Sequence, residues 1–191
     1  MKIATREYYR KTVHFSGIFF IPLLLWNRHI FAALLALFLA IYLAVEFLDR
    51  RERRIPLLTT FTEMCKRAFE EGRLSRGAIL LVVAGIVSPY LFGTQAAAIG
   101  LSQTFAADVT STIAGIRWGR LKLPYSKRKS WVGSTVFLVT AFIVSLYFVS
   151  WPQALVLALI GAVVESLPIS EADNLTVPLA VGLAAVIFGL I

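Results

Sequence analysis

The sequence predicts an all-α integral membrane protein, a polytopic helical bundle of about seven transmembrane segments that forms one membrane-embedded domain over residues 1–191. First, 58% of the residues are hydrophobic and only 16% are charged, which is too apolar for an ordinary soluble domain. Second, the apolar residues form long runs separated by charged connections. Third, the formal charge of +8 lies in those connections and not on a soluble face, so we expect no nucleic-acid partner.

Seven apolar segments follow one another along the chain. They lie at residues 13–26, 30–48, 77–92, 94–116, 132–149, 152–165 and 176–191. Several are shorter than the ~20 residues that a helix needs to cross the hydrocarbon core, notably the first, sixth and seventh. We therefore expect these three to be buried in the bundle, to tilt little, or to be surrounded by a locally thinned bilayer.

The distribution of basic residues predicts the orientation in the membrane. If the amino terminus is cytoplasmic, 18 of the 19 Lys and Arg residues lie on the cytoplasmic side, in the amino-terminal tail and in the 49–76 and 117–131 loops. Only Arg28 lies on the opposite side. Because cytoplasmic loops are enriched in Lys and Arg, we predict a cytoplasmic amino terminus and, with seven crossings, an external carboxyl terminus.

The longest connection, residues 49–76, combines basic residues with an apolar helical pattern. The apolar positions are Leu57, Leu58, Phe61, Met64, Ala68 and Phe69. A helix with one apolar and one basic face lies in the membrane interface, so we predict an interfacial amphipathic helix here. Two roles are open for this cytoplasmic loop: attraction to anionic membrane lipids, or gating of substrate entry.

Three carboxylates lie within apolar segments, where burial of an ionisable group is costly. Glu46 and Glu165 are close to predicted cytoplasmic ends, where a carboxylate can reach water. Asp108 precedes Arg117 by nine residues. At 1.5 Å per residue it would lie about 13 Å inside that arginine along a helix. Either an interhelical bond satisfies Asp108 or the acid has a function, and its depth favours function.

A polar and small face accompanies Asp108 at helical spacing. Its members are Thr104, Asp108, Ser111, Thr112, Gly115 and Gly119. The glycines suit either close helix packing or the approach of an anion to open backbone. A carboxylate binds phosphate through a metal ion, and Mg²⁺ typically takes one or two carboxylates together with phosphate oxygens. We therefore predict that Asp108 holds Mg²⁺ and that the basic loop after it meets phosphates.

A second acidic stretch, ESLPISEADNLTVP, runs from Glu165 to Pro178 without a lysine or arginine. Its polar residues are Glu165, Glu171, Asp173 and Asn174, among others. One interpretation is a polar turn in which Asp173 or Asn174 caps the last helix. The other is a second set of metal or nucleotide contacts, which the surrounding positive charge favours.

The stretch DVTSTIAGIRWGRLKLPYSKRKSWVGS resembles the nucleotide-binding signature of the CTP-dependent polyprenol kinases, a family that includes dolichol, phytol and CTP-dependent diacylglycerol kinases and is related to phosphatidate cytidylyltransferases. The matching residues are Asp108, Gly115, Gly119, Lys129, Ser130, Gly133 and Ser134. Val132 departs from the family, which has a glutamate at that position.

Further stretches resemble the same family. RKTVHFSG is similar to its amino-terminal element, with Arg10, Lys11 and His14, and ESLPISEADNLTVP is similar to its acidic element. Glu46, followed by Arg50, is similar to a shorter motif. The resemblance thus spans most of the chain and adds a lipid or accessory site made of Arg10, Lys11, His14 and Glu46.

The resemblance implies transfer of the terminal phosphate of CTP, with Mg²⁺, to the hydroxyl of a membrane lipid alcohol such as dolichol, polyprenol or geranylgeraniol at the cytoplasmic face. Asp108 and Lys129 would be catalytic, and Asp108, Glu165 and Asp173 would hold the metal. The nucleotide contacts would be Gly115, Arg117, Gly119, Lys122, Lys129, Ser130, Gly133, Ser134 and Asn174. The alternatives are a cytidylyltransferase, a diacylglycerol kinase, a small transporter and a structural membrane subunit.

Overall fold

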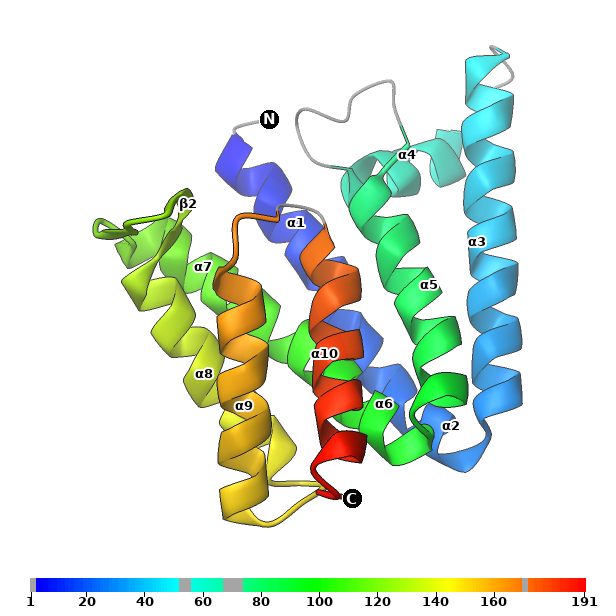
Figure 1. Ribbon diagram of the computed structural model, residues 1–191. Helices are drawn as coiled ribbons and strands as arrows, with labels where there is room; N and C mark the ends of the chain where they lie inside the picture. The colour runs from blue at the N-terminus through cyan, green and yellow to red at the C-terminus, as the bar shows by residue number, and fades with distance from the viewer. Residues whose placement is uncertain (1–2, 52–55, 67–73, 170–171) are drawn as a thin grey trace.

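Helices make up nearly all of the part of the protein that the computed structural model describes, which is residues 3–51, 56–66, 74–169 and 172–191. The predicted all-α class is confirmed. The helices run up and down in one bundle, with the amino terminus at one end and the carboxyl terminus at the other (Figure 1). The elements in order are α1 (Ile3–Ser16), η1 (Gly17–Phe20), α2 (Ile21–Trp26), α3 (Arg28–Arg50), α4 (Pro56–Cys65), α5 (Arg76–Leu91), α6 (Thr94–Ser102), η3 (Gln103–Ala107), α7 (Asp108–Trp118), β1 (Lys122–Leu123), β2 (Ser126–Ser130), α8 (Trp131–Ser145), α9 (Trp151–Ser166) and α10 (Asp173–Ile187).

Each predicted apolar segment coincides with a helix or with a run of consecutive helical pieces. Local signals explain the breaks between them. Asn27 ends α2 and caps α3, because its Oδ1 accepts hydrogen bonds from the backbone N–H groups of His29 at 2.9 Å and Ile30 at 3.1 Å. Gly93 separates α5 from α6 with φ of 84°, a conformation that glycine adopts at little cost.

The helices differ in whether they are long enough to cross a bilayer alone. Among the described residues, α3 with 23 residues is the one helix long and apolar enough to cross a bilayer by itself. The apolar helices α5, α8, α9 and α10 have 15 or 16 residues, which is roughly 22–24 Å at 1.5 Å per residue. The seven crossings and their orientation therefore stay predictions.

Helix α6 is the centre of the bundle, since every residue from Ala96 to Ser102 is buried. Two apolar clusters meet on it. Ala96 and Ile99 belong to the cluster with α8, α9 and α10, whereas Ala97 and Leu101 belong to the cluster with α2 and α3. Small side chains on α6 let its neighbours approach closely, as is common between membrane helices.

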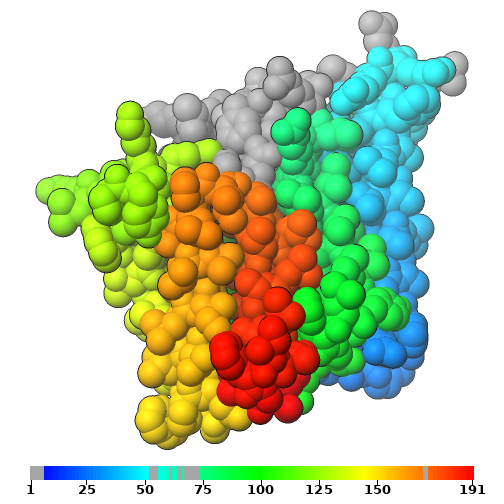
Figure 2. Space-filling view, in the orientation of Figure 1, coloured from blue at the N-terminus to red at the C-terminus, as the bar shows by residue number. Residues whose placement is uncertain are grey.

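The 117–131 connection contains a short antiparallel hairpin that an all-α prediction does not include. Strand β1 pairs with β2, with Lys122 opposite Ser130 and Leu123 opposite Ser126. Pro124 lies in the turn, where its fixed φ is favourable. In the space-filling view, the hairpin region projects at one corner of the bundle (Figure 2). The hairpin lies at the same end of the bundle as the amino terminus and α4 (Figure 1).

The predicted amphipathic helix of the 49–76 loop is present as α4 over part of its expected length. Its Leu57 is 81% exposed. Helix α4 packs against α3 and α1. It lies near the end of the bundle that holds the amino terminus (Figure 1). Ala68 and Phe69, which complete the predicted apolar face, lie outside the described residues. The interfacial location of this helix stays a prediction.

Replacing Gly100 tests the close contact between α6 and α10. A Cβ at this position would lie 2.6 Å from the carbonyl oxygen of Pro178 and 2.9 Å from its Cα, both of which are backbone atoms. Gly100→Ala should therefore lower the free energy of unfolding by about 1–3 kcal/mol. Thermal unfolding in detergent measures this loss. The control is Leu183→Ala on the same helix α10, where the side chain is 47% exposed and a much smaller effect is expected. An increase in Tm for Gly100→Ala would contradict the contact, because alanine is otherwise the better helix former.

Candidate active site

A cavity of about 970 Å³ lies between α1, α7, the β1–β2 hairpin and the adjoining ends of α8, α9 and α10. Thirteen of the sixteen residues predicted to form the site line this cavity, although they come from three separate stretches of sequence. They are Arg10, Lys11, Asp108, Gly115, Arg117, Gly119, Lys122, Lys129, Ser130, Gly133, Ser134, Glu165 and Asp173. The amino-terminal, signature and acidic elements therefore meet at one place in the fold.

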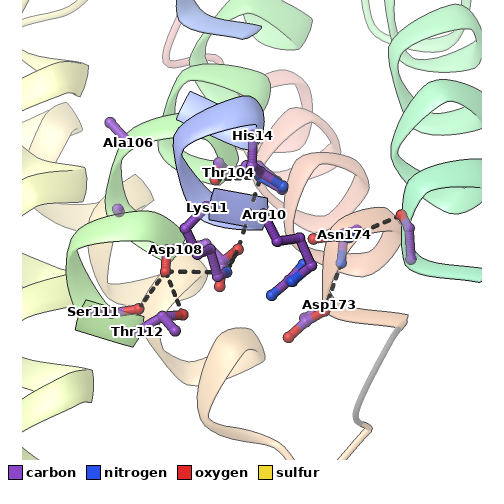
Figure 3. A network of polar contacts seen from close by, with 12 residues as sticks. Arg10, Lys11, His14, Thr104, Ala106, Asp108, Ser111, Thr112, Asp173 and Asn174 are labelled. Atoms are coloured by element: carbon purple, nitrogen blue, oxygen red, sulfur yellow. Dashed lines mark hydrogen bonds and ion pairs between the residues drawn. The ribbon is translucent and has the colours of Figure 1, made fainter. Parts of the chain in front are cut away.

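Asp108 begins α7 and is only 6% exposed. Its carboxylate accepts a hydrogen bond from Nζ of Lys11 on α1, and the same Nζ lies 3.4 Å from the backbone carbonyl oxygen of Asp108 (Figure 3). Nε2 of His14 lies 3.7 Å from Oδ2 of Asp108. Burial lowers the pKa of Lys11, and attraction to Asp108 opposes that shift. The amino-terminal element thus supplies the positive charge that compensates the buried acid.

Lys129 on β2 forms a second cluster of opposite charges. Its Nζ donates to Glu165 at the end of α9 and lies 3.4 Å from Oδ2 of Asp173, the first residue of α10. Burial acts to lower the pKa of Lys129, but attraction to Glu165 and Asp173 outweighs burial, and the pKa is raised. Both acids of the predicted acidic element therefore face the lysine of the predicted nucleotide signature. Glu171, named with them, lies outside the described residues.

Two buried oxygen atoms in the cavity wall are without a partner among the described residues. They are Oε2 of Glu165 and Oγ of Ser134. An unpartnered buried carboxylate oxygen fits a bound cation, because a buried polar atom otherwise costs about 1–3 kcal/mol. The described residues contain no group of three or more His, Cys, Asp or Glu side chains arranged around one metal position. The donor set fits Mg²⁺ that arrives with phosphate oxygens as its other ligands.

The signature glycines bring α7 against the start of α8. A Cβ on Gly119 would lie 2.5 Å from Oγ of Ser130, and one on Gly133 would lie 3.2 Å from the same atom. That hydroxyl caps α8 by accepting a hydrogen bond from the N–H of Gly133 at 3.1 Å. Of the two roles considered for Gly115 and Gly119, close packing thus applies at Gly119. Gly115 has more space, since its Cβ would be 3.4 Å from Oγ of Ser130.

Three predicted site residues lie outside the lining of the cavity. Nε2 of His14 donates to the carbonyl oxygen of Thr104 at 3.1 Å, directly behind Asp108. Nδ2 of Asn174 donates to the carbonyl oxygen of Gly77 at 2.8 Å, which ties the start of α10 to the start of α5 (Figure 3). Asn174 therefore helps to fix the position of Asp173, the preceding residue, whose Oδ1 accepts a hydrogen bond from the N–H of Asn174.

Glu46 is the third of these residues, and it belongs to a separate ion pair. Its Oε1 lies 2.8 Å from Nζ of Lys66, which also lies 2.7 Å from Oε1 of Glu63. Lys66 is 1% exposed. This cluster joins α3 to the end of α4 and contributes no residue to the cavity lining.

Sequence reasoning missed several residues of the cavity wall, among them Glu7 and Tyr125. Glu7 accepts hydrogen bonds from Nε and Nη2 of Arg10 and so fixes the guanidinium. Its spacing of three residues from Arg10, typical of a helical ion pair, was an available signal. The hydroxyl of Tyr125 in the hairpin turn lies 3.0 Å from Oγ of Ser166 on α9. No sequence pattern indicates that contact.

Three relatives with assigned or probable kinase names are similar to this chain. The probable chloroplastic phytol kinase of Triticum aestivum is 35% identical over 149 residues, which cover 66% of this chain and 50% of the relative. Chloroplastic phytol kinase 1 of Arabidopsis thaliana is 31% identical, with 92% of this chain and 64% of the relative covered. Chloroplastic farnesol kinase of Arabidopsis thaliana is 39% identical over 95 residues, which cover 41% of this chain and 31% of the relative.

The chain spans about half the length of the first of these relatives. No family model matches the chain, and no solved structure gives a significant match. The relatives nevertheless agree with the resemblance carried by the motifs around Lys11, Asp108, Lys129 and Asp173. The chain therefore belongs to the polyprenol kinase family, together with the phytol and farnesol kinases.

Proposed function

We propose that the protein is a prenyl alcohol kinase, which transfers the terminal phosphate of CTP to the hydroxyl of an isoprenoid alcohol. One observation carries the proposal: a single cavity brings together three buried carboxylates, the buried Lys11 and the half-buried Lys129, with further basic residues in its wall. The names of the relatives, phytol kinase and farnesol kinase, support an isoprenoid acceptor of that size class. Dolichol and longer polyprenols belong to the same chemical class of acceptor.

The reaction joins the hydroxyl oxygen of the alcohol to the terminal phosphorus of CTP and breaks the bond from that phosphorus to the bridging oxygen, so that CDP leaves. The hydroxyl proton passes to a base. Such transfers depend chiefly on positioning and on neutralising charge on the phosphoryl oxygens. The three acids do not surround one metal position, so Asp108 on one side, and Glu165 with Asp173 on the other, would each hold Mg²⁺ only together with phosphate oxygens, to which the ion would supply positive charge.

The basic side chains of the cavity have different roles in this proposal. Lys129 is held in place by Glu165 and Asp173 and would contact the transferred phosphate. Arg117 and Lys122 are exposed at the cavity and would bind the outer phosphates. The first turn of α8 also lines the cavity with Gly133 and Ser134, and the positive end of a helix dipole favours bound phosphate.

We propose that the acceptor reaches the cavity from the membrane. The 58% hydrophobic composition supports a multi-pass membrane protein, and the lining of the cavity includes Ile116, which is 47% exposed. The basic loops lie at the same end of the bundle as the amino terminus (Figure 1). The positive-inside rule assigns that end to the cytoplasm, where CTP is available.

Asp108→Asn tests the metal role of the buried acid. An amide neither carries the charge nor matches carboxylate as a Mg²⁺ ligand, so kcat should fall by roughly 10²–10³-fold, the scale of losing one preorganised charge contact. Transfer of labelled phosphate to phytol or farnesol measures kcat, and circular dichroism checks the fold. The matched control is Glu46→Gln, the same change at a buried acid outside the cavity. Full activity of Asp108→Asn would refute the metal role.

Labelled CTP distinguishes the proposed kinase from its alternatives. Purified protein is incubated with Mg²⁺, CTP and a panel of phytol, farnesol, geranylgeraniol, dolichol and diacylglycerol. A kinase leaves label from the terminal phosphate on the lipid, and a prenyl alcohol kinase prefers the isoprenoids to diacylglycerol. A cytidylyltransferase leaves label from the cytidine on a lipid phosphate, and a transporter turns over no CTP. Absence of label on every lipid, with a folded protein that binds CTP, would refute the proposal.

A further inference from the structure

The helical run from Thr94 to Trp118 contains one π turn, η3, immediately before Asp108. The backbone N–H of Asp108 bonds to the carbonyl oxygen of Gln103, five residues earlier, whereas an α-helix uses the residue four earlier. A π turn therefore holds one extra residue. In an α-helix one residue corresponds to a rotation of about 100°, so the π turn sets the direction of every later side chain.

The rotation decides which residues face the cavity. After the π turn, Asp108, Ser111, Thr112 and Gly115 all line it. Thr104, at the start of the same predicted polar face, does not line the cavity. Its hydroxyl instead donates to the carbonyl oxygen of Gly100 at 2.9 Å. The helix face that lines the cavity thus begins at Asp108, and the π turn separates this face from the preceding helix α6.

Gln103 anchors the π turn to the bundle. Its side chain is fully buried, and Nε2 donates to Oγ of Ser145 on α8 at 3.0 Å. Its Oε1 faces α9, since a Cβ on Gly161 would lie 2.1 Å from that oxygen. Oε1 has no partner among the described residues. An apolar side chain of similar size would avoid the cost of burying an unpartnered oxygen, so stability alone does not account for an amide here.

Helix α1 contacts the other side of the π turn. Nε2 of His14 donates to the carbonyl oxygen of Thr104, and the ring packs edge-on against Phe105 with centroids 5.8 Å apart (Figure 3). Phe105 in turn lies over Gly17, where a Cβ would come within 2.3 Å of its ring. The π turn is therefore held between α1 on one side and α8 and α9 on the other. π turns are rare, so surrounding contacts of this kind are needed to maintain one.

We propose that Gln103 is a positioning residue for phosphoryl transfer: its amide fixes the π turn that directs the carboxylate of Asp108 into the cavity. The inference rests on the proposed function, because it takes Asp108 to be the metal ligand. Without the amide anchor, the turn can relax toward α-helical hydrogen bonding, which rotates Asp108 away from Lys11 and from the metal position. A misplacement of about 1 Å is enough to cost on the order of 10²-fold in rate.

Gln103→Met is the informative variant, because methionine has a similar length but no amide. The matched control is Thr140→Val, which removes a different side-chain hydrogen bond to α8, the 3.0 Å contact from Thr110 on α7 to Thr140. We expect Gln103→Met to lower kcat by about 10- to 100-fold with Tm within a few degrees of the wild type. Thr140→Val should stay within about twofold of the wild-type kcat, because it leaves the π turn intact.

Mn²⁺ binding in the presence of CTP, followed by electron paramagnetic resonance, gives a readout that does not require turnover. Gln103→Met should weaken Mn²⁺ binding about tenfold, which is the lower end of the loss expected for kcat. Thr140→Val should leave the Mn²⁺ affinity unchanged. If the wild type binds Mn²⁺ and CTP but phosphorylates no lipid, the proposed function fails while the positioning role is still measured.

Ser145→Ala provides a second variant should Gln103→Met not fold, because it removes only the acceptor of the amide. The expected loss is smaller and in the same direction for both kcat and Mn²⁺ affinity. Wild-type values of both quantities in Gln103→Met, or in Ser145→Ala where that variant replaces it, would overturn the proposal. An equal loss in Thr140→Val would also overturn it, since the effect would then belong to any side-chain hydrogen bond from η3 or α7 to α8.

Discussion

The ion pair between Lys11 and Asp108 is the interaction on which the arrangement of the cavity depends. It joins residues 97 positions apart in the chain, and both side chains are almost completely buried. A buried charge without a partner carries a penalty of several kcal/mol, so each residue offsets much of the cost of burying the other. The pair consequently fixes α1 beside α7, and with it the place of Arg10 and His14 relative to the cavity.

Small residues and charges divide the bundle into two functional parts. Toward the carboxyl-terminal end, α6 packs its alanines and Gly100 closely against the surrounding helices. At the opposite end the helices leave a cavity in which three acids and their lysines collect. The close packing at the carboxyl-terminal end and the charged side chains at the opposite end are suited to hold a polar ligand at a fixed depth in the bundle. An alcohol that enters from the lipid can reach the ligand at that depth.

Much of the helical architecture and most of the candidate site residues could be predicted from sequence. The local and tertiary geometry that places these residues relative to one another could not. Apolar runs locate the helices because burial in lipid or in a bundle requires continuous apolar surface, and Asp108 is evident because a charge interrupts such a run. The hairpin was missed since β1 has only two residues, too few for an alternating pattern. The π turn at Gln103 has no periodic signature. Glu46 pairs with Lys66, a tertiary contact that a motif cannot reveal.

The two lysine–carboxylate clusters also mean that the cavity carries its own counter-ions. In each cluster the positive and negative groups are already close, so the buried charges nearly balance one another, whereas the exposed Arg and Lys side chains of the wall leave the cavity as a whole positive. A ligand that brings a divalent cation together with phosphates exchanges partners with these groups and adds little uncompensated charge. Recognition by the buried clusters then depends on matching a pattern of alternating charges, which favours a metal–nucleotide complex over a bare anion of equal charge, whereas the contribution of the exposed basic side chains weakens as salt rises.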